Sequence, residues 1–201
     1  MHISEGVLSA PVLIGSGVLA VGGTIIGLRR IEQENVMPAA LLSAAFFVAS
    51  LVHVPIGPAS VHLVLTGLLG LVLGWGCFPA ILVGLFLQAV FFQFGGLTVL
   101  GANTVTMATP AVFCHYLVRR WMEQPGTRMP AAFAAGFLAI LFSALLTAAV
   151  LDFSNEGFAA AAKMLIIANM PIMVIEGCVT MFTVAFIAKV QPEILQVKTA
   201  S

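Results

Sequence analysis

Between Asn35 and Arg119 the sequence contains no Asp, Glu, Lys or Arg. A helix that crosses a bilayer needs about 20 mainly apolar residues, so this stretch alone has room for roughly four crossings. The whole chain is 61% hydrophobic and 8% charged, with a mean hydropathy of +1.12. Such a composition excludes a soluble domain of this size. The sequence therefore predicts an all-α integral membrane protein with a single membrane-embedded domain over residues 1–201.

Apolar segments recur along the chain and predict a bundle of about seven transmembrane helices. The last apolar stretch is too long for one straight crossing, and Pro171 is expected to divide it into an interfacial part and a span. Glycines at GxxxG spacing in the first and third segments would let neighbouring helices approach closely. The expected segments are 7–28, 37–52, 61–74, 78–94, 105–118, 131–151 and the part of 158–188 beyond Pro171.

Basic residues set the expected orientation of the bundle. If the N-terminus lies outside and the C-terminus in the cytoplasm, Lys163 alone among them falls on the outer side. This distribution agrees with the positive-inside rule. The formal net charge of zero gives no reason to expect a nucleic-acid partner. The basic residues expected on the cytoplasmic side are Arg29, Arg30, Arg119, Arg120, Arg128, Lys189 and Lys198.

Two polar interruptions are expected near the outer face. In VHVPIGPASVH the prolines force a break, and His62 is expected to follow it at the head of the third helix, recessed from water. The stretch FGGLTVLGANTVTM is expected to form an irregular loop in the outer mouth of the bundle, with Asn103 free to donate and accept hydrogen bonds. The alternative for this stretch is a plain surface loop between two helices.

The first two residues, Met1 and His2, could form a metal chelate. The free amine of Met1, the amide nitrogen that joins it to His2, and Nδ1 of His2 close two fused rings around one ion. A fourth nitrogen in the same plane, for which His62 is the candidate, would suit Ni(II), Cu(II) or Co(II). Met1 is expected to be retained because His2 is not small, and MHISEG lacks the pattern of a signal peptide. The alternative is an ordinary chain start with no metal.

Other polar residues have more than one interpretation. His53 could be an alternate ligand, a hydrogen-bond partner of a ligand, or an interfacial side chain; His115 is expected to be interfacial near the cytoplasmic end. Glu176 lies in an apolar run and has either a function or a structural hydrogen bond to a neighbouring helix or loop. Glu5 is expected to fix the N-terminal segment from the start of the first helix. Three cysteines at unrelated spacings are interpreted as buried small hydrophobic residues: Cys77, Cys114 and Cys178.

No catalytic signature occurs in the sequence. The Walker A pattern GxxxxGK[ST] is absent, so the chain is not expected to couple ATP hydrolysis by itself. HExxH and GxSxG, which would indicate a protease or hydrolase, are also absent. The sequence favours binding over catalysis.

Four segments in order resemble the CbiM/NikM family, the substrate-binding membrane components (S-components) of energy-coupling factor transporters for cobalt and nickel. These are MHISEG, VPIGPASVHLVLTG, QAVFFQFGGLTVLGANTVTM and NMPIMVIEGCVT. The resemblance implies that Met1, His2 and His62 bind Ni(II) or Co(II) as the transported substrate, without an organic cofactor. It also implies a prokaryotic inner membrane, a transmembrane coupling subunit, two ABC ATPase subunits and a small accessory membrane protein as partners.

Two departures from the family pattern concern details of loop closure and selectivity. Gln93 and Phe94 stand where the family often has Gly-Asp, and Asn169 stands where it often has His. Two rival functions stay open: a membrane electron carrier with haem held by histidines, and a vitamin-binding S-component without a metal. The sequence does not choose between nickel and cobalt.

Overall fold

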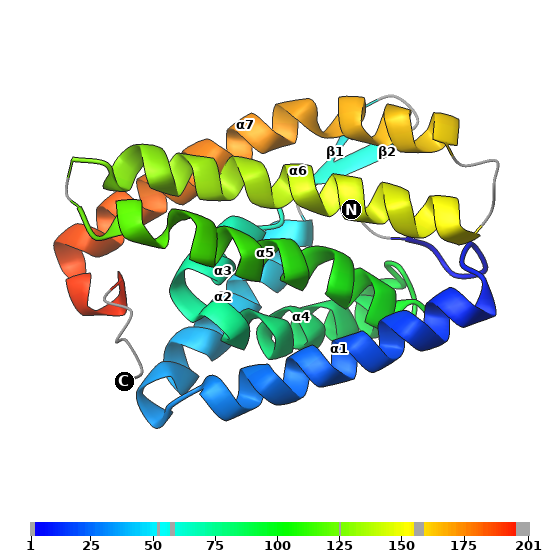
Figure 1. The fold of residues 1–201 in the computed structure, drawn as a ribbon, viewed down its shortest axis with the longest axis horizontal. Helices are drawn as coiled ribbons and strands as arrows, with labels where there is room; N and C mark the ends of the chain where they lie inside the picture. The colour runs from blue at the N-terminus through cyan, green and yellow to red at the C-terminus, as the bar shows by residue number, and fades with distance from the viewer. Residues whose placement is uncertain (1–2, 52, 57–58, 125, 155–158, 196–201) are drawn as a thin grey trace.

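The computed structural model describes residues 3–51, 53–56, 59–124, 126–154 and 159–195, and for 53–56, 59–62 and 159–165 this description covers the backbone (Figure 1). Long helices dominate it. Two short 3-10 helices are η1 (Gly74–Gly76) and η2 (Pro192–Leu195). The other elements are α1 (Ala10–Arg30), α2 (Gln33–Leu51), β1 (His53–Ile56), β2 (Ala59–His62), α3 (Thr66–Leu73), α4 (Cys77–Phe92), α5 (Leu100–Met122), α6 (Arg128–Ser154) and α7 (Ala159–Val190).

The predicted helical membrane protein is confirmed, whereas a count of seven spans is not. Within the described residues, five segments are long and apolar enough to cross a bilayer: 10–30, 33–51, 66–92, 128–154 and 166–190. The third of these joins α3, η1 and α4, because α3 with eight residues reaches only about 12 Å, less than half of the hydrocarbon core. The 23 residues of α5 include several polar side chains and are not among the five.

Helix α1 places small residues toward the bundle and large apolar residues outside. On α1 the buried residues are Ser16, Ala20, Gly23 and Gly27, which recur at helical spacing on one face. The opposite face exposes large apolar side chains such as Ile14, which is 69% accessible. Without water to drive apolar side chains inward, membrane helices pack through small residues and leave large apolar ones toward lipid. The arrangement is the one a bilayer favours.

The break after α2 is a β-hairpin, which corrects the expected start of the third helix. Strands β1 and β2 pair antiparallel, with His53 opposite His62. Helix α3 begins only at Thr66, so His62 ends a strand and does not stand at the head of a helix. Leu65, which precedes α3, has a φ of 56°, and this left-handed backbone prevents the helix from continuing toward the hairpin.

Two further boundaries differ from the sequence expectation. Helix α5 starts at Leu100, so Asn103 lies in its first turn and not in an irregular loop. Helix α7 continues through Pro171 instead of dividing there. Packing compensates for the hydrogen bond that a proline removes: α6 and α7 lie side by side, and a Cβ on Gly136 would stand 2.5 Å from the carbonyl oxygen of Glu176 (Figure 1).

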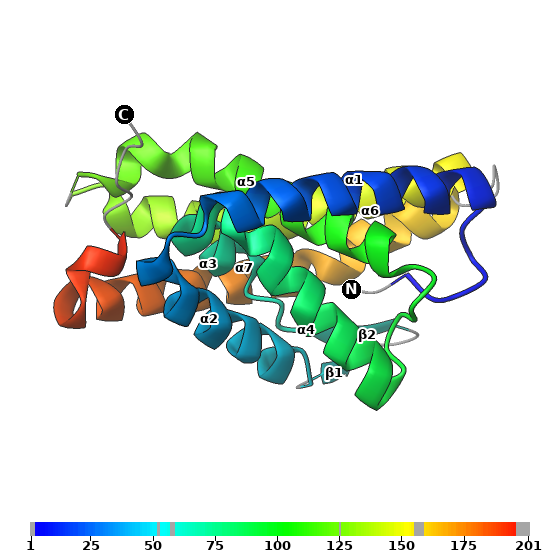
Figure 2. The same cartoon turned by 90° about the horizontal axis from the view of Figure 1, so that it is seen from below.

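The C-terminal ends of α1, α5 and α7 all lie toward one end of the bundle, on the left in Figure 1 and again in Figure 2. Each of these ends has basic residues in its last turn: Arg29 and Arg30, Arg119 and Arg120, and Lys189. The N-terminal segment, the loop between α4 and α5 and the start of α7 lie toward the opposite end. The fold therefore groups the basic residues of these three helices at one end of the bundle, as the sequence predicts.

Candidate functional site

The predicted ligands lie at the edge of the described structure. Met1 and His2 fall outside the described residues, and for His62 the structure gives the backbone, which ends strand β2. The residues that immediately follow these ligands are described in detail. They show how the two segments that carry the predicted ligands are fixed.

The backbone next to His2 is held by Asn103. Oδ1 of Asn103 accepts a hydrogen bond of 2.9 Å from the amide nitrogen of Ile3, and Nδ2 donates one of 3.1 Å to the carbonyl oxygen of Ile3. Both residues are buried, with 2% and 4% of their surfaces accessible. A side-chain amide that pairs with both groups of one residue fixes that peptide in position and orientation. The hydrogen-bonding capacity predicted for Asn103 is thus directed at the N-terminal segment.

An apolar cluster supports the same segment. Ile3 and Leu8 pack against Val99 and Ala102 at the start of α5 and Leu151 near the end of α6. Because this cluster excludes water, the hydrogen bonds between Ile3 and Asn103 lie in a low-dielectric environment, where they are stronger. Ile3 and Leu8 therefore anchor the N-terminal segment in the bundle, whereas residues 4–6 between them are exposed.

Glu5 also fixes the N-terminal segment, but by another means than expected. Its Oε1 accepts hydrogen bonds of 3.1 Å from both the amide nitrogen and Oγ1 of Thr98. Helix α1 begins five residues later, so the predicted interaction with that helix terminus is wrong. The hydrogen bond from the Thr98 amide holds the pKa of Glu5 below its usual value. The contact is therefore present at neutral pH and is lost as pH falls through that lowered pKa.

Gly96 gives Glu5 the space for this contact. Gly96 has a φ of 126°, a backbone conformation that other residues rarely adopt, and a Cβ there would overlap the side chain of Glu5. We expect Gly96→Ala to release Glu5 and to accelerate amide hydrogen exchange in residues 3–8, measured by mass spectrometry. Gly15→Ala, at an exposed site with open space around it, should leave this exchange unchanged. Equal exchange in both variants would contradict the role given to Gly96.

The backbone that follows His62 is held by Glu176. Oε1 of Glu176 accepts hydrogen bonds from the amides of Val64 and Leu65, the latter at 2.7 Å. The side chain is fully buried, and Oε2 has no hydrogen-bond partner in the part of the chain that the structure describes. Of the two interpretations of Glu176, the hydrogen bond to a neighbouring loop is present. It fixes the chain two residues after the predicted ligand.

A third polar contact, between Gln88 and Ser50, was not predicted from the sequence. Nε2 of Gln88 on α4 donates a 2.5 Å hydrogen bond to Oγ of Ser50, which in turn donates one of 2.7 Å to the carbonyl oxygen of Phe47. Both side chains are buried. The contact ties α4 to the end of α2, just before the hairpin that carries His53 and His62. The position of Gln88 within an apolar run is the sequence feature that could have indicated this buried contact.

The remaining candidates do not assemble into a metal site. His115, which was predicted to be interfacial, is buried within the bundle, with 7% of its surface accessible. Its Nδ1 lies 2.9 Å from the carbonyl oxygen of Gly70. Cys77 and Cys114 are buried, as predicted, and Cys178 is partly buried. Among the described residues, no group of three His, Cys, Asp or Glu side chains could hold an ion.

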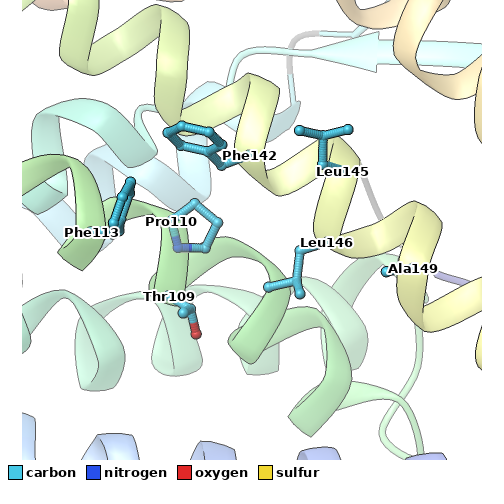
Figure 3. A pocket seen from close by; sticks show the side chains of 7 residues that line it. All are labelled: Thr109, Pro110, Phe113, Phe142, Leu145, Leu146 and Ala149. Carbon is cyan, nitrogen blue, oxygen red and sulfur yellow. The ribbon is translucent and has the colours of Figure 1, made fainter.

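A cleft of about 390 Å³ between α5 and α6 offers no metal ligands either (Figure 3). Aromatic rings and aliphatic side chains form most of its wall, which is lined by Thr109, Pro110, Phe113, Phe142, Leu145, Leu146 and Ala149. Transition metals in proteins take nitrogen, sulfur or carboxylate ligands, and none is present here. The fixed segments next to His2 and His62 remain the candidate site.

The fold and these contacts describe a polytopic membrane protein whose N-terminal segment is anchored by buried Ile3 and Leu8 and by hydrogen bonds. The model of the family described as the cobalt uptake substrate-specific transmembrane region, CbiM, matches residues 2–194. The chain belongs to this family. A protein of Haemophilus influenzae named for metal transport is 40% identical over 199 residues, 97% of each chain. The cobalt transport protein CbiM of Sorangium cellulosum is 31% identical over 97% of this chain and 94% of its own.

Solved structures show the same fold. The chain is similar to a transition metal transporter with a TM-score of 0.82 over 94% of this chain and 93% of that one, at 24% sequence identity. A truncated transition metal transporter gives a TM-score of 0.81 over 94% of this chain and 99% of its own, again at 24% identity. At this identity the likeness supports the architecture.

Proposed function

We propose that the chain is the substrate-binding membrane subunit of an energy-coupling factor importer and captures Ni(II) or Co(II) at the external face. The ligands are the amine of Met1, the amide nitrogen and Nδ1 of His2, and the imidazole of His62. One observation carries the proposal. Buried side chains hold the backbone immediately after both ligand segments, Asn103 at Ile3 and Glu176 at Val64 and Leu65.

This support suits a metal site because a chelate needs ligands held in position. Metal affinity depends on groups that orient the ligands, and loss of such a group costs about ten- to a hundredfold. Asn103 and Glu176 have this role in the proposal. His53 pairs with His62 across the hairpin and is proposed as a nearby partner of the site.

Charge gives Glu176 a second role in the proposed site. A divalent ion bound to one deprotonated amide nitrogen carries a net charge of +1. An ionised carboxylate that is fully buried is costly unless a positive charge lies near it. Oε2 of Glu176, which has no hydrogen-bond partner among the described residues, would meet that positive charge when the metal is bound.

Uptake requires partners, since the chain has no ATP-binding pattern and is not an enzyme in this proposal. A transmembrane coupling subunit, two ABC ATPases and a small accessory membrane protein would supply and transmit the energy. The N-terminus would lie outside and the C-terminus inside a prokaryotic cytoplasmic membrane. The shared end of α1, α5 and α7, with its basic residues, supports this orientation.

The test is the metal content of the purified protein after incubation with Ni(II) or Co(II) and removal of free ion. The proposal predicts one ion in each chain by elemental mass spectrometry, without a Soret band. A haem Soret band, or tight binding of a vitamin with no metal, would support the rival functions instead.

Asn103 provides a prediction that separates support of the ligands from general stability. We expect Asn103→Leu to weaken Ni(II) or Co(II) binding by about ten- to a hundredfold, because Ile3 loses both side-chain hydrogen bonds. Thr106→Val on the same helix removes one bond to the carbonyl oxygen of Asn103 and should leave metal affinity unchanged. Calorimetric titration of both variants checks this. Wild-type metal affinity in Asn103→Leu would contradict the proposed role of Asn103 in supporting the ligands.

A further inference from the structure

A half-enclosed cavity of about 340 Å³ lies at the end of the bundle where α5 ends and α6 begins. The C-terminal part of α5, the start of α6 and the 3-10 helix η2 form its wall. This cavity shares no residue with the proposed metal site. Its polar lining is His115 and Arg119 from α5, Glu123 just after the end of α5, and Arg128 from α6.

The two arginines bring hydrogen-bond donors into this cavity from different helices. Nε of Arg128 donates a 3.0 Å hydrogen bond to the carbonyl oxygen of Met122, which fixes its guanidinium against the end of α5. Nε of Arg119 lies 3.9 Å from Oε1 of Glu123, a long contact, and the side chain of Arg119 is 28% accessible. The terminal nitrogens of both guanidinium groups make no hydrogen bond to any described residue. Two guanidinium groups that line one cavity and keep free donors favour a phosphate or carboxylate there.

The cavity is amphipathic, because its other residues are apolar. Leu71 from α3, Met122 from α5 and Leu195 from η2 contribute the apolar part of the wall. His115 also lines the cavity, and its Nδ1 lies 2.9 Å from the carbonyl oxygen of Gly70. A ligand that fits such a wall has an anionic head attached to an apolar or weakly polar stem.

Aromatic side chains indicate that this end of the bundle lies at a membrane surface. Trp121 and Tyr116 on α5 are about half exposed, and Trp75 and Arg30 both donate hydrogen bonds to the hydroxyl of Tyr116, at 3.1 and 3.4 Å. Tryptophan and tyrosine gather at the level of the lipid headgroups. The cavity therefore opens where headgroups are the most abundant anions.

We propose that this cavity binds a phosphate group, that of an anionic phospholipid headgroup, through Arg119 and Arg128. The glycerol part of the lipid lies against Leu71, Met122 and Leu195. Basic pockets between transmembrane helices are known sites for such headgroups. Glu123, whose side chain is 69% exposed, competes with the phosphate for Arg119 and swings into water when the lipid is bound.

The test measures binding of short-chain phosphatidylglycerol to the full chain in a neutral detergent by native mass spectrometry. Arg119→Gln should weaken binding by about tenfold, the effect of one charge-assisted hydrogen bond. Arg120→Gln, an exposed neighbour outside the cavity with the same change of charge, should stay within about twofold of wild type. Glu123→Gln should strengthen lipid binding. Because Glu123 is exposed, this variant is expected to fold and so tests the proposal even if Arg119→Gln fails to fold.

Inorganic phosphate serves as the competitor and separates the two sources of the group. Displacement of the lipid by millimolar phosphate would support a site that recognises the phosphate group alone. Lipid binding that phosphate does not displace would support recognition of the phosphate together with the glycerol part of the lipid. Equal loss in Arg119→Gln and Arg120→Gln, or no effect of Glu123→Gln, would overturn the proposal. Binding that does not depend on Arg119 would also overturn it.

Discussion

Replacement of His62 by alanine is expected to abolish tight binding of Ni(II) and Co(II), with affinity falling by more than about a hundredfold. The reason is geometric. In the proposed site the chelate formed by Met1 and His2 supplies three nitrogens in one plane, and His62 supplies the fourth from strand β2. Loss of a ligand costs more than loss of a group that orients one, which costs about ten- to a hundredfold. Calorimetric titration with each metal measures the change.

Cys114→Ala is the matched control for His62→Ala. Cys114 is a metal-binding residue type, but it is 1% accessible within α5 and belongs to no cluster of ligands among the described residues. Its replacement should leave the titration unchanged. His2→Ala should behave like His62→Ala. Retention of one tightly bound ion in either histidine variant would contradict the ligand set.

Replacement of Glu176 has the second largest expected effect, and two variants separate its two roles. Glu176→Ala leaves the buried amides of Val64 and Leu65 without an acceptor, at a cost of about 1–3 kcal/mol each. Glu176→Gln keeps an oxygen that accepts both hydrogen bonds but removes the charge. We therefore expect the alanine variant to lose stability and the glutamine variant to fold but bind metal at least about tenfold more weakly.

Thermal unfolding in detergent and metal titration together check this pair. Unchanged stability in Glu176→Ala would contradict the structural role of the two hydrogen bonds. Unchanged metal affinity in a folded Glu176→Gln would mean that the carboxylate does not balance the charge of the ion. The two results are independent, because one concerns the apoprotein and the other the bound ion.

The sequence predicted the membrane class and the grouping of polar residues for simple physical reasons. Long uncharged stretches have few other folds available, and basic residues at helix ends follow the membrane potential and lipid charge. Asn103 and Glu176 also stood out, because a polar side chain in an apolar run must find a partner. The sequence could not show which partner, and the structure assigns Ile3 to Asn103 and Val64 and Leu65 to Glu176.

The misplaced boundaries come from tertiary interactions that a local pattern does not contain. The prolines in 55–58 predicted a break, but pairing of His53 with His62 makes the break a hairpin. Pro171 predicted an interruption, yet close packing of α7 on α6 at Gly136 keeps the helix continuous. Contacts between segments far apart in the sequence decide both cases.

The central claim is that the amino terminus itself is a metal ligand, and one calorimetric comparison tests it most directly. The two proteins are the native chain, which begins at Met1, and a form with a short Gly-Ser extension before Met1. The extension keeps every side chain but displaces the free amine and its chelate ring. The account predicts tight binding of one Ni(II) or Co(II) ion by the native chain and its loss in the extended form. Equal binding by both would contradict the N-terminal site and direct attention to His53 and His62.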